Sequence, residues 1–148
     1  MSSKRRVLFL CTGNSVRSQM AEGLVNHFLG QQWQAFSAGT RPAERVHPLA
    51  VQVMAELGID ISSARPKPAA LFAHASFDLV ITVCAGAAED CPFWPGAGRV
   101  MHMGFADPSL EPGNLEEQLA AFRRVRDGIR TRILPFLERE AANVTTGL

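Results

Sequence analysis

The chain has 148 residues, of which 47% are apolar and 20% charged, and its formal net charge is +1. This length supports one domain with its own hydrophobic core, which we predict to span residues 1–148. The nearly balanced charge gives no general attraction to nucleic acid or to an anionic membrane surface, so we expect neither as a partner. The basic start at residues 4–6 precedes an apolar run far shorter than the roughly 20 residues that cross a bilayer. We therefore expect a cytoplasmic protein, and a monomer.

Apolar residues recur with strand-like and helix-like spacings along the whole chain. In chain order, the patterns predict a strand at 6–10, a helix at 15–29, a strand at 33–40, a helix at 47–57, a short helix ending near residue 73, strands at 77–84 and 99–103, and a helix at 114–141. Strands that alternate with helices indicate a parallel sheet with helices on both faces. We therefore predict the α/β class, as a three-layer, doubly wound, four-stranded parallel sheet.

The last predicted helix is the longest and is amphipathic. Its apolar residues form one stripe, which consists of Leu115, Leu119, Phe122, Val125, Ile129, Ile133 and Phe136. We expect this stripe to face the core and Pro135 to kink the helix.

The chain contains three cysteines, Cys11, Cys84 and Cys91. An odd number of cysteines in a protein expected in the cytoplasm argues against a structural disulfide framework. A buried, unreactive cysteine is a common core residue. However, ligands of open parallel sheets bind beyond the carboxyl ends of the strands. Because Cys11, Ser37 and Cys84 fall at predicted strand ends, we treat Cys11 and Cys84 as candidate functional residues.

Residues 11–17, CTGNSVR, join the first predicted strand to the first predicted helix. A tight loop at this place directs backbone N–H groups toward one point in front of a helix N-terminus, which is the arrangement of an anion site. Gly13 and Asn14 give the loop conformational freedom, and Arg17 offers a planar fork to two oxygens of a tetrahedral anion. These positive surroundings lower the pKa of the Cys11 thiol and favour a nucleophilic thiolate. The alternative is that Cys11 only ends a core strand and Arg17 is a solvated helix residue.

Several short stretches resemble one enzyme family. The loop and the start of the helix, CTGNSVRSQMAEG, are similar to the active-site loop of the low-molecular-weight protein tyrosine phosphatase superfamily. More narrowly, they resemble the thioredoxin-coupled arsenate reductases that share its fold. The stretches FSAGT, LGIDIS, DLVITVC and GFADPS follow in the order expected for these proteins. The resemblance covers roughly residues 5–138, and it implies this fold and an oxyanion substrate.

The resemblance implies roles for residues of the loop and of one later turn. It implies that the substrate is bound by Thr12, Gly13, Asn14, Ser15, Val16, Arg17 and Ser18. It also implies that the Ser18 hydroxyl hydrogen-bonds the Cys11 thiolate, and that Asp107, followed by Pro108, is the general acid that protonates the departing oxygen. Without the resemblance, Ser18 could equally cap a helix, and Asp107 could be an ordinary turn residue.

The two later cysteines separate reductase chemistry from phosphatase chemistry. A phosphatase needs only Cys11, Arg17 and Asp107, whereas the reduction of As(V) to As(III) needs two electrons, which a dithiol supplies. The resemblance implies a relay: Cys11 attacks arsenic, Cys84 attacks the Cys11 sulfur and releases arsenite, and Cys91 then takes over the disulfide.

Residues 84–91, CAGAAEDC, contain several helix-favouring residues. A helix would hold the Cα atoms of Cys84 and Cys91 about 10 Å apart, beyond the roughly 7 Å that a disulfide tolerates. We therefore expect the segment to unwind when this disulfide forms. The alternative is that the two thiols are unrelated.

The sequence carries no nicotinamide or flavin fingerprint, so the electrons must come from a partner protein. The resemblance implies thioredoxin as this partner, acting by thiol–disulfide exchange, and no tightly bound cofactor. We predict no zinc or other metal site of the usual cysteine spacing. Some members of the family bind potassium, and Asn14, Glu22 and Ser37 match that pattern. The further aspartate of the pattern has no counterpart around residues 65–68, so we expect at most a weak potassium site.

Two other functions compete with arsenate reduction. The first is a phosphotyrosine or small-phosphoester phosphatase. Against it, the chain has no tyrosine, and Ser109 stands where such phosphatases often carry an aromatic residue. The second is a non-catalytic regulator that binds As(III) through three thiols, in which Arg17 and Asp107 would be unnecessary. We predict arsenate as the substrate, phosphate and sulfate as competing oxyanions, and a weak residual phosphatase activity.

Overall fold

The computed structural model describes residues 4–85 and 98–146, with side chains up to residue 142. Its elements are β1 (Arg5–Cys11), α1 (Arg17–Phe28), β2 (Trp33–Gly39), α2 (Pro48–Ala55), the 3-10 turn η1 (Ala69–Phe72), β3 (Leu79–Cys84), β4 (Val100–Phe105), the 3-10 turn η2 (Pro108–Leu110) and α3 (Leu115–Thr146). The predicted strands and the three predicted long helices are all present. The predicted short helix is the 3-10 turn η1.

The four strands form one parallel sheet in the order β2-β1-β3-β4. The predicted α/β class with a four-stranded parallel sheet is therefore confirmed. β1 is a central strand, and its residues 7–11 are buried. Cys11 pairs with Gly39 at the carboxyl end of β2, and Cys84 ends β3 after a register irregularity. Because all strands run the same way, these ends meet at one edge of the sheet.

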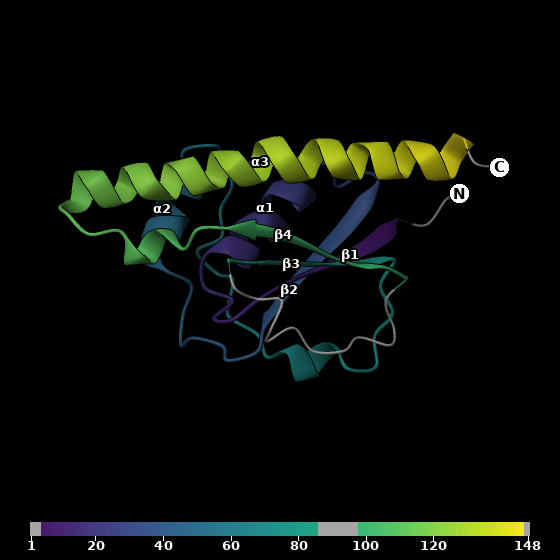
Figure 1. Ribbon diagram of the computed structural model, residues 1–148, viewed down its shortest axis with the longest axis horizontal. Coiled ribbons are helices and arrows are strands. Elements are labelled where there is room, and N and C mark those ends of the chain that lie inside the picture. Colours follow the sequence, from purple (N-terminus) through teal and green to yellow (C-terminus); the bar gives the residue numbers. More distant parts are fainter. Residues whose placement is uncertain (1–3, 86–97, 147–148) are drawn as a thin grey trace.

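The larger core lies between the sheet and the three α-helices. Figure 1 shows α3 extending along the length of the molecule, with α1 next to it and the strands beyond. Met20 of α1, Met54 of α2 and Phe122 of α3 belong to this one buried cluster. Trp33 at the start of β2 is fully buried in it and donates its indole N–H to the Leu137 carbonyl oxygen at 3.1 Å.

The opposite face of the sheet has a smaller core. Leu8 and Val80 from the sheet pack there with three phenylalanines, Phe36, Phe72 and Phe77. The ring centroids of the three phenylalanines are 5.7–5.8 Å apart with edge-to-face geometry, which is the favourable one for aromatic pairs. Phe72 belongs to η1, so a single short turn brings an aromatic cover to this face.

The helix α3 is a continuous helix of 32 residues that passes through Pro135, so this proline does not end it, and the kink expected there stays a prediction. A helical proline costs one backbone hydrogen bond, and packing of the flanking Ile133 and Leu137 in the core compensates for it. The prediction that Leu115, at the start of the apolar stripe of α3, faces the core is wrong. Leu115 is 58% exposed, because it lies in the first turn and the core contacts of α3 begin at Leu119.

An ion-pair network joins α2 to α3. Glu56, which caps the end of α2, accepts two-pronged hydrogen bonds from Arg123 and one from Arg126 at 2.7 Å. Arg126 is buried and also donates to the Val53 carbonyl oxygen at 2.8 Å. The hydrogen bonds from Arg123 and Arg126 lower the pKa of Glu56 to about 2.

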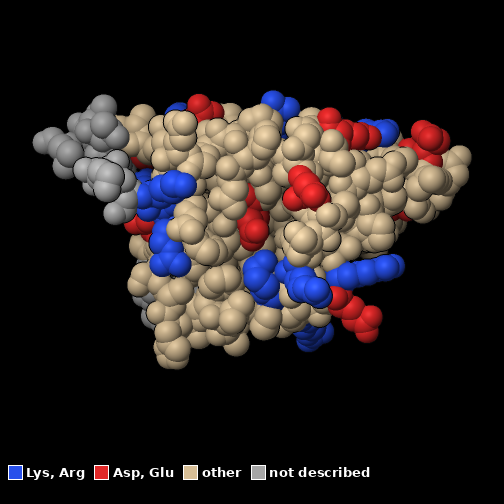
Figure 2. All heavy atoms as spheres, turned by 180° about the vertical axis from the view of Figure 1, so that it is seen from behind, with Lys and Arg blue, Asp and Glu red and all other residues tan. Residues whose placement is uncertain are grey.

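Charged side chains are dispersed over the surface. On the face seen in Figure 2, small basic groups alternate with acidic ones, and wide uncharged areas separate them. This distribution agrees with the net charge of +1. Among the described residues, no helix combines the length and the hydropathy that crossing a membrane requires.

Candidate active site

Residues 11–17, which we call the oxyanion loop, curl around the sulfur of Cys11 between β1 and α1. The Asn14 backbone N–H donates to the Cys11 sulfur at 3.2 Å, and the Ser18 hydroxyl lies 2.8 Å from it. Asn14 adopts a left-handed backbone conformation with φ 52°, as its residue type allows, whereas the predicted freedom of Gly13 is not used for a positive φ. A cavity of about 200 Å³ is lined by the loop and by Asp107.

The outer side of the oxyanion loop is held by backbone hydrogen bonds from the segment after β2. The carbonyl oxygens of Thr12, Gly13 and Ser15 accept from the backbone N–H groups of Arg41, Ala43 and His47, each at 2.9 Å. With the carbonyl oxygens occupied on the outside, the loop is arranged to present N–H groups on its inside. This is the geometry of an anion-binding loop.

Gly39 allows the end of β2 to approach the oxyanion loop closely. A Cβ atom at this position would lie 2.5 Å from the Thr12 carbonyl oxygen and 3.1 Å from the Asn14 side chain. No other residue type fits without displacing the loop backbone. The FSAGT stretch stands out in the sequence, but this role of Gly39 does not, because nothing local in a strand reveals which backbone passes beside it.

The side chain of Asn14 organises the base of the loop through three hydrogen bonds. Its Oδ1 accepts from the Gln19 amide at 3.1 Å and from the Lys67 backbone N–H at 2.8 Å. Its Nδ2 donates to the Ser18 hydroxyl at 2.7 Å. Asn14, Ser18 and Gln19 are all buried, so these hydrogen bonds replace contacts with water. Gln19 and Lys67 were not foreseen from the sequence, because they act through atoms that become neighbours only in the fold.

Ser18 lies behind the Cys11 sulfur and does not line the cavity. Its hydroxyl is shared between the Cys11 sulfur and the Asn14 amide. It is not a helix cap, because the N-cap position of α1 is Val16, which makes no side-chain capping bond. Of the two interpretations of Ser18 that the sequence allowed, the structure shows the contact to sulfur.

Arg17 and Asp107 face each other across the cavity. One terminal nitrogen of Arg17 donates to the Phe105 carbonyl oxygen at 3.2 Å, and the other lies 3.5 Å from Asp107 Oδ2. The Nε of Arg17 is buried and finds no hydrogen-bond partner among the described residues. Buried N–H donors nearly always have an acceptor. We therefore expect Nε of Arg17 to donate to an oxygen of a bound anion.

The carboxyl group of Asp107 is held in one orientation. Its Oδ1 accepts from the Ser109 backbone N–H at 3.0 Å and from the Ser109 hydroxyl at 2.7 Å. Its Oδ2 is therefore left on the side of Arg17 and the cavity. The loop that positions Asp107 leads from β4 into η2. This side of the cavity therefore comes from a different part of the chain than the oxyanion loop.

Cys84 at the end of β3 contacts the same loop. Its sulfur accepts a hydrogen bond from the Thr12 backbone N–H at 2.9 Å. The hydrogen bond from the Cys84 thiol, helped by the donors of Ser18 and Asn14, lowers the pKa of Cys11 to about 6, although burial acts in the opposite direction. The pKa of Cys84 is raised, because its thiol donates to Cys11, is buried and lies beside that negative charge.

The structure thus brings together four of the five predicted catalytic residues: Cys11, Arg17, Cys84 and Asp107. The fifth, Cys91, and the expected unwinding between Cys84 and Cys91, lie outside the described residues.

The oxygens expected to bind potassium do not fit that ion here. Glu22 Oε1 accepts from the Ser37 hydroxyl at 2.7 Å and lies 3.6 Å from the Lys67 ammonium nitrogen. Asn14 Oδ1 already accepts two hydrogen bonds. In the part of the chain that the structure describes, no group of three or more His, Cys, Asp or Glu residues could hold a metal.

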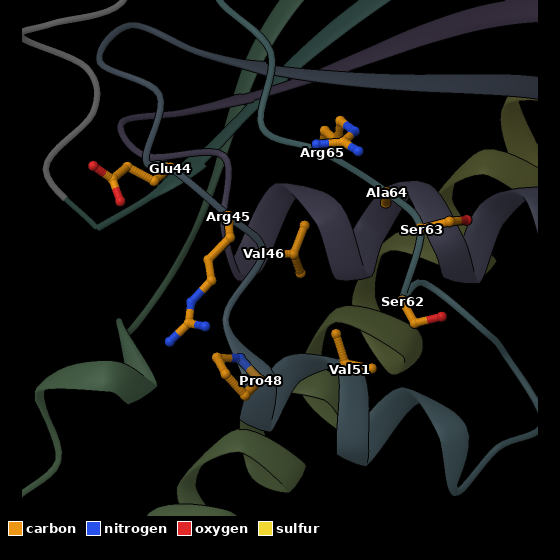
Figure 3. Close-up of a pocket in the computed structure, with 9 residues that line it drawn as sticks. All are labelled: Glu44, Arg45, Val46, Pro48, Val51, Ser62, Ser63, Ala64 and Arg65. Carbon is orange, nitrogen blue, oxygen red and sulfur yellow. The ribbon is translucent and has the colours of Figure 1, made fainter.

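A larger hollow of about 450 Å³ lies beside the site, but it contains none of the predicted catalytic residues. Figure 3 shows it between the segment of Glu44 and Arg45 on one side and Ser62 to Arg65 on the other. Its polar lining residues are exposed. The smaller cavity of the oxyanion loop is therefore the candidate active site, because a depressed thiol pKa, a buried unpaired donor and a fixed carboxyl group coincide there.

Comparisons with known proteins agree with this geometry. The model of the low molecular weight phosphotyrosine protein phosphatase family matches residues 6–145. The arsenate reductase of Halalkalibacterium halodurans is 46% identical over 136 residues, which cover 92% of this chain and 97% of that protein.

Two solved structures show the same fold. An arsenate reductase in the phosphate binding state has a TM-score of 0.78 and 31% identity, covering 91% of this chain and 98% of that one. The thioredoxin-dependent arsenate reductase of Corynebacterium glutamicum has a TM-score of 0.64 and 30% identity, covering 95% of this chain and 63% of that one. The resemblance noted in the sequence is confirmed: the chain belongs to the low molecular weight phosphotyrosine protein phosphatase family and is similar over most of its length to bacterial arsenate reductases.

Proposed function

We propose that this protein reduces arsenate to arsenite through Cys11, Cys84 and Cys91, and that a thioredoxin restores its thiols. The observation that carries the proposal is a second thiol beside the oxyanion loop: the Cys84 sulfur accepts from the Thr12 N–H at 2.9 Å, and the Cys84 thiol lowers the pKa of Cys11. Phosphoester hydrolysis has no use for this thiol, whereas reduction by two electrons requires one. The arsenate reductases to which the chain is similar support the same choice.

In the first step, arsenate enters the cavity and its oxygens accept from loop N–H groups and from the buried Nε of Arg17. The Cys11 thiolate attacks arsenic and forms a sulfur–arsenic bond. One arsenate oxygen leaves as water, and Asp107 is the acid that supplies a proton to it. Arsenic is still As(V) in this adduct.

In the second step, the Cys84 sulfur attacks the Cys11 sulfur. The sulfur–sulfur bond forms, the sulfur–arsenic bond breaks, and its electron pair stays on arsenic, which leaves as As(III) in arsenite. Formation of the adduct favours this attack, because Cys11 then no longer carries the negative charge that raised the pKa of Cys84, and the Cys84 thiol loses its proton more easily. The Arg17 charge and the Thr12 hydroxyl remain, and both favour the Cys84 thiolate.

In the third step, Cys91 attacks Cys84, so that the disulfide moves to Cys84–Cys91 and the Cys11 thiol is free again. A dithiol partner of the thioredoxin class then reduces this disulfide by exchange, and its own two thiols become the oxidised pair. The thioredoxin-dependent relative with the same fold supports this partner.

A single-turnover experiment tests the relay without any partner. The reduced protein is mixed with arsenate, arsenite is quantified, and the disulfide is located by mass spectrometry of peptides. The wild type should give one arsenite per chain and a Cys84–Cys91 disulfide, whereas Cys91→Ser should give one arsenite and a trapped Cys11–Cys84 disulfide. Cys84→Ser should release no arsenite, and arsenite release by that variant would contradict the proposed order.

A weak phosphatase activity is the second candidate, since the cavity holds a thiolate, Arg17 and Asp107, which suffice for phosphoester hydrolysis. No aromatic residue is among the described residues that line the cavity, so an aryl group gains little stacking energy there. We expect slow hydrolysis of p-nitrophenyl phosphate that Cys11→Ser abolishes and Cys91→Ser leaves unchanged.

A further inference from the structure

Lys67 connects three parts of the active-site base. Its backbone N–H donates to Asn14 Oδ1 in the oxyanion loop, and its carbonyl oxygen accepts from the Gly39 N–H at the end of β2, each at 2.8 Å. Its ammonium nitrogen lies 3.6 Å from Glu22 of α1 and donates to the Arg65 carbonyl oxygen at 3.3 Å. The loop, the sheet and the first helix therefore meet at this residue.

The ammonium group stands among oxygen atoms. Glu22 supplies a carboxylate, which also accepts from the buried Ser37 hydroxyl, and Arg65 supplies a carbonyl oxygen. Carboxylate, hydroxyl and carbonyl oxygens are also the ligands of hard cations. The Lys67 ammonium therefore already supplies a charge of +1 at this position, covalently attached to the chain. It neutralises the Glu22 carboxylate, whose side chain is only 24% exposed.

The residue type fits this role. The chain has only two lysines, Lys4 and Lys67, and its other basic residues are arginines. An ammonium group is a compact charge with three donors, comparable in shape to a monovalent ion, whereas a guanidinium group is planar and wider.

We propose that the Lys67 ammonium is a tethered cation that takes the place of the monovalent metal ion expected at this site, so that the oxyanion loop of this protein is stabilised independently of potassium. Lys67 is a positioning residue: its backbone holds Asn14, which holds Ser18, which contacts the Cys11 sulfur. This inference does not depend on whether the loop processes arsenate or a phosphoester.

The test is the cation dependence of thermal unfolding. Unfolding midpoints are measured in KCl and in tetramethylammonium chloride at equal ionic strength, for the wild type, Lys67→Asp and Lys67→Met. The matched control is Lys4→Asp, which makes the same charge change at an exposed position. A purely structural role of Lys67 would lower the midpoint equally in both salts.

The wild type and Lys4→Asp should have the same midpoint in both salts, within error. Lys67→Asp, with two carboxylates at the site, should unfold lower in tetramethylammonium and regain at least about 3 °C in KCl. Lys67→Met should show a smaller preference of the same sign, and it decides the question if Lys67→Asp does not fold. A potassium-specific gain in the wild type, or equal midpoints of both Lys67 variants in the two salts, would overturn the inference.

Discussion

The reactivity of Cys11 is decided by a few hydrogen-bond donors around one sulfur atom. Burial by itself would raise the pKa of this thiol, because a charged form is poorly solvated in the interior. The thiol of Cys84, the hydroxyl of Ser18 and the backbone N–H groups of Ser18 and Asn14 outweigh that effect. The balance brings the pKa to about 6, so Cys11 is a thiolate at neutral pH.

Removal of the Cys84 donor should raise the pKa of Cys11. In a Cys91→Ser background, the rate of Cys11 alkylation by iodoacetamide should rise with pH around a midpoint near 6, because only the thiolate reacts. With Cys84→Ala this midpoint should move upward by about one unit. Mass spectrometry of the Cys11 peptide measures the rate. Cys84→Ser, which keeps a hydroxyl donor, is the control and should shift less, and an unchanged midpoint in Cys84→Ala would show that Cys84 does not tune Cys11.

Residue types and their positions made Cys11 and Arg17 candidates, because a thiol at a strand end followed by an arginine at a helix start is typical of an anion site. Asp107 was identified through the family resemblance, since by residue type it could also be an ordinary turn residue. Residue types could not decide whether Ser18 caps a helix or contacts the sulfur, since both need only a hydroxyl near a helix start. The role of Lys67 was also invisible, because it depends on a backbone contact between residues 53 positions apart.

At the scale of elements, the oxyanion loop is shaped by the strand end beside it. Gly39→Ala should destabilise the protein by about 1–3 kcal/mol, since its Cβ would lie 2.5 Å from the Thr12 carbonyl oxygen. It should also weaken phosphate binding, because the displaced backbone belongs to the anion site. Denaturant unfolding and phosphate titration measure the two effects. Gly128→Ala in α3 is the matched control, because its nearest contact is an ordinary 3.8 Å, and a similar loss there would contradict this explanation.

The ion-pair network between α2 and α3 should make stability depend on acid pH. The pKa of Glu56 is near 4.5 ordinarily and about 2 in the folded state. A lowered carboxyl pKa stabilises the fold above the ordinary value, and this contribution is lost as the pH falls from about 4.5 toward 2. Because the Glu56 side chain is 34% exposed, we expect solvent to limit the contribution to about 1 kcal/mol.

The variant Glu56→Gln should therefore lose about 1 kcal/mol of unfolding free energy at pH 7. Its difference from the wild type should shrink as the pH approaches 2–3, where the wild-type carboxylate also gains its proton. Urea unfolding at several pH values measures this. Glu138→Gln, at an exposed position of α3, should change little at any pH, and a constant difference for Glu56→Gln across the pH range would speak against the ion-pair explanation.

Hydrophobic periodicity predicted the elements well because buried strands and amphipathic helices leave strong patterns. It placed Leu115 in the core wrongly, since periodicity gives the face of a helix and not the point at which the helix reaches the core. It correctly carried the last helix through Pro135, because core packing on both sides of the proline holds the helix together.

At the scale of the whole molecule, the parallel sheet assembles the site from distant segments. The loop after β1 carries Cys11 and Arg17, the end of β3 carries Cys84, and the turn after β4 carries Asp107. The alternation of strands and helices in the sequence was enough to predict that the carboxyl ends of these strands lie at one edge of the sheet. The contact of the Cys84 sulfur with the Thr12 N–H, which brings this thiol to the oxyanion loop, comes only from the fold, and the place of Cys91 lies outside the described residues.

The central claim is a disulfide relay that a partner protein resets, and its most direct test is coupled turnover. NADPH consumption is followed with thioredoxin reductase, thioredoxin and arsenate, for the wild type and for Cys91→Ser side by side. We expect sustained NADPH consumption that requires arsenate and thioredoxin in the wild type and that is lost in Cys91→Ser. Absence of turnover in the wild type, together with efficient hydrolysis of p-nitrophenyl phosphate by both proteins, would contradict it and identify a phosphatase.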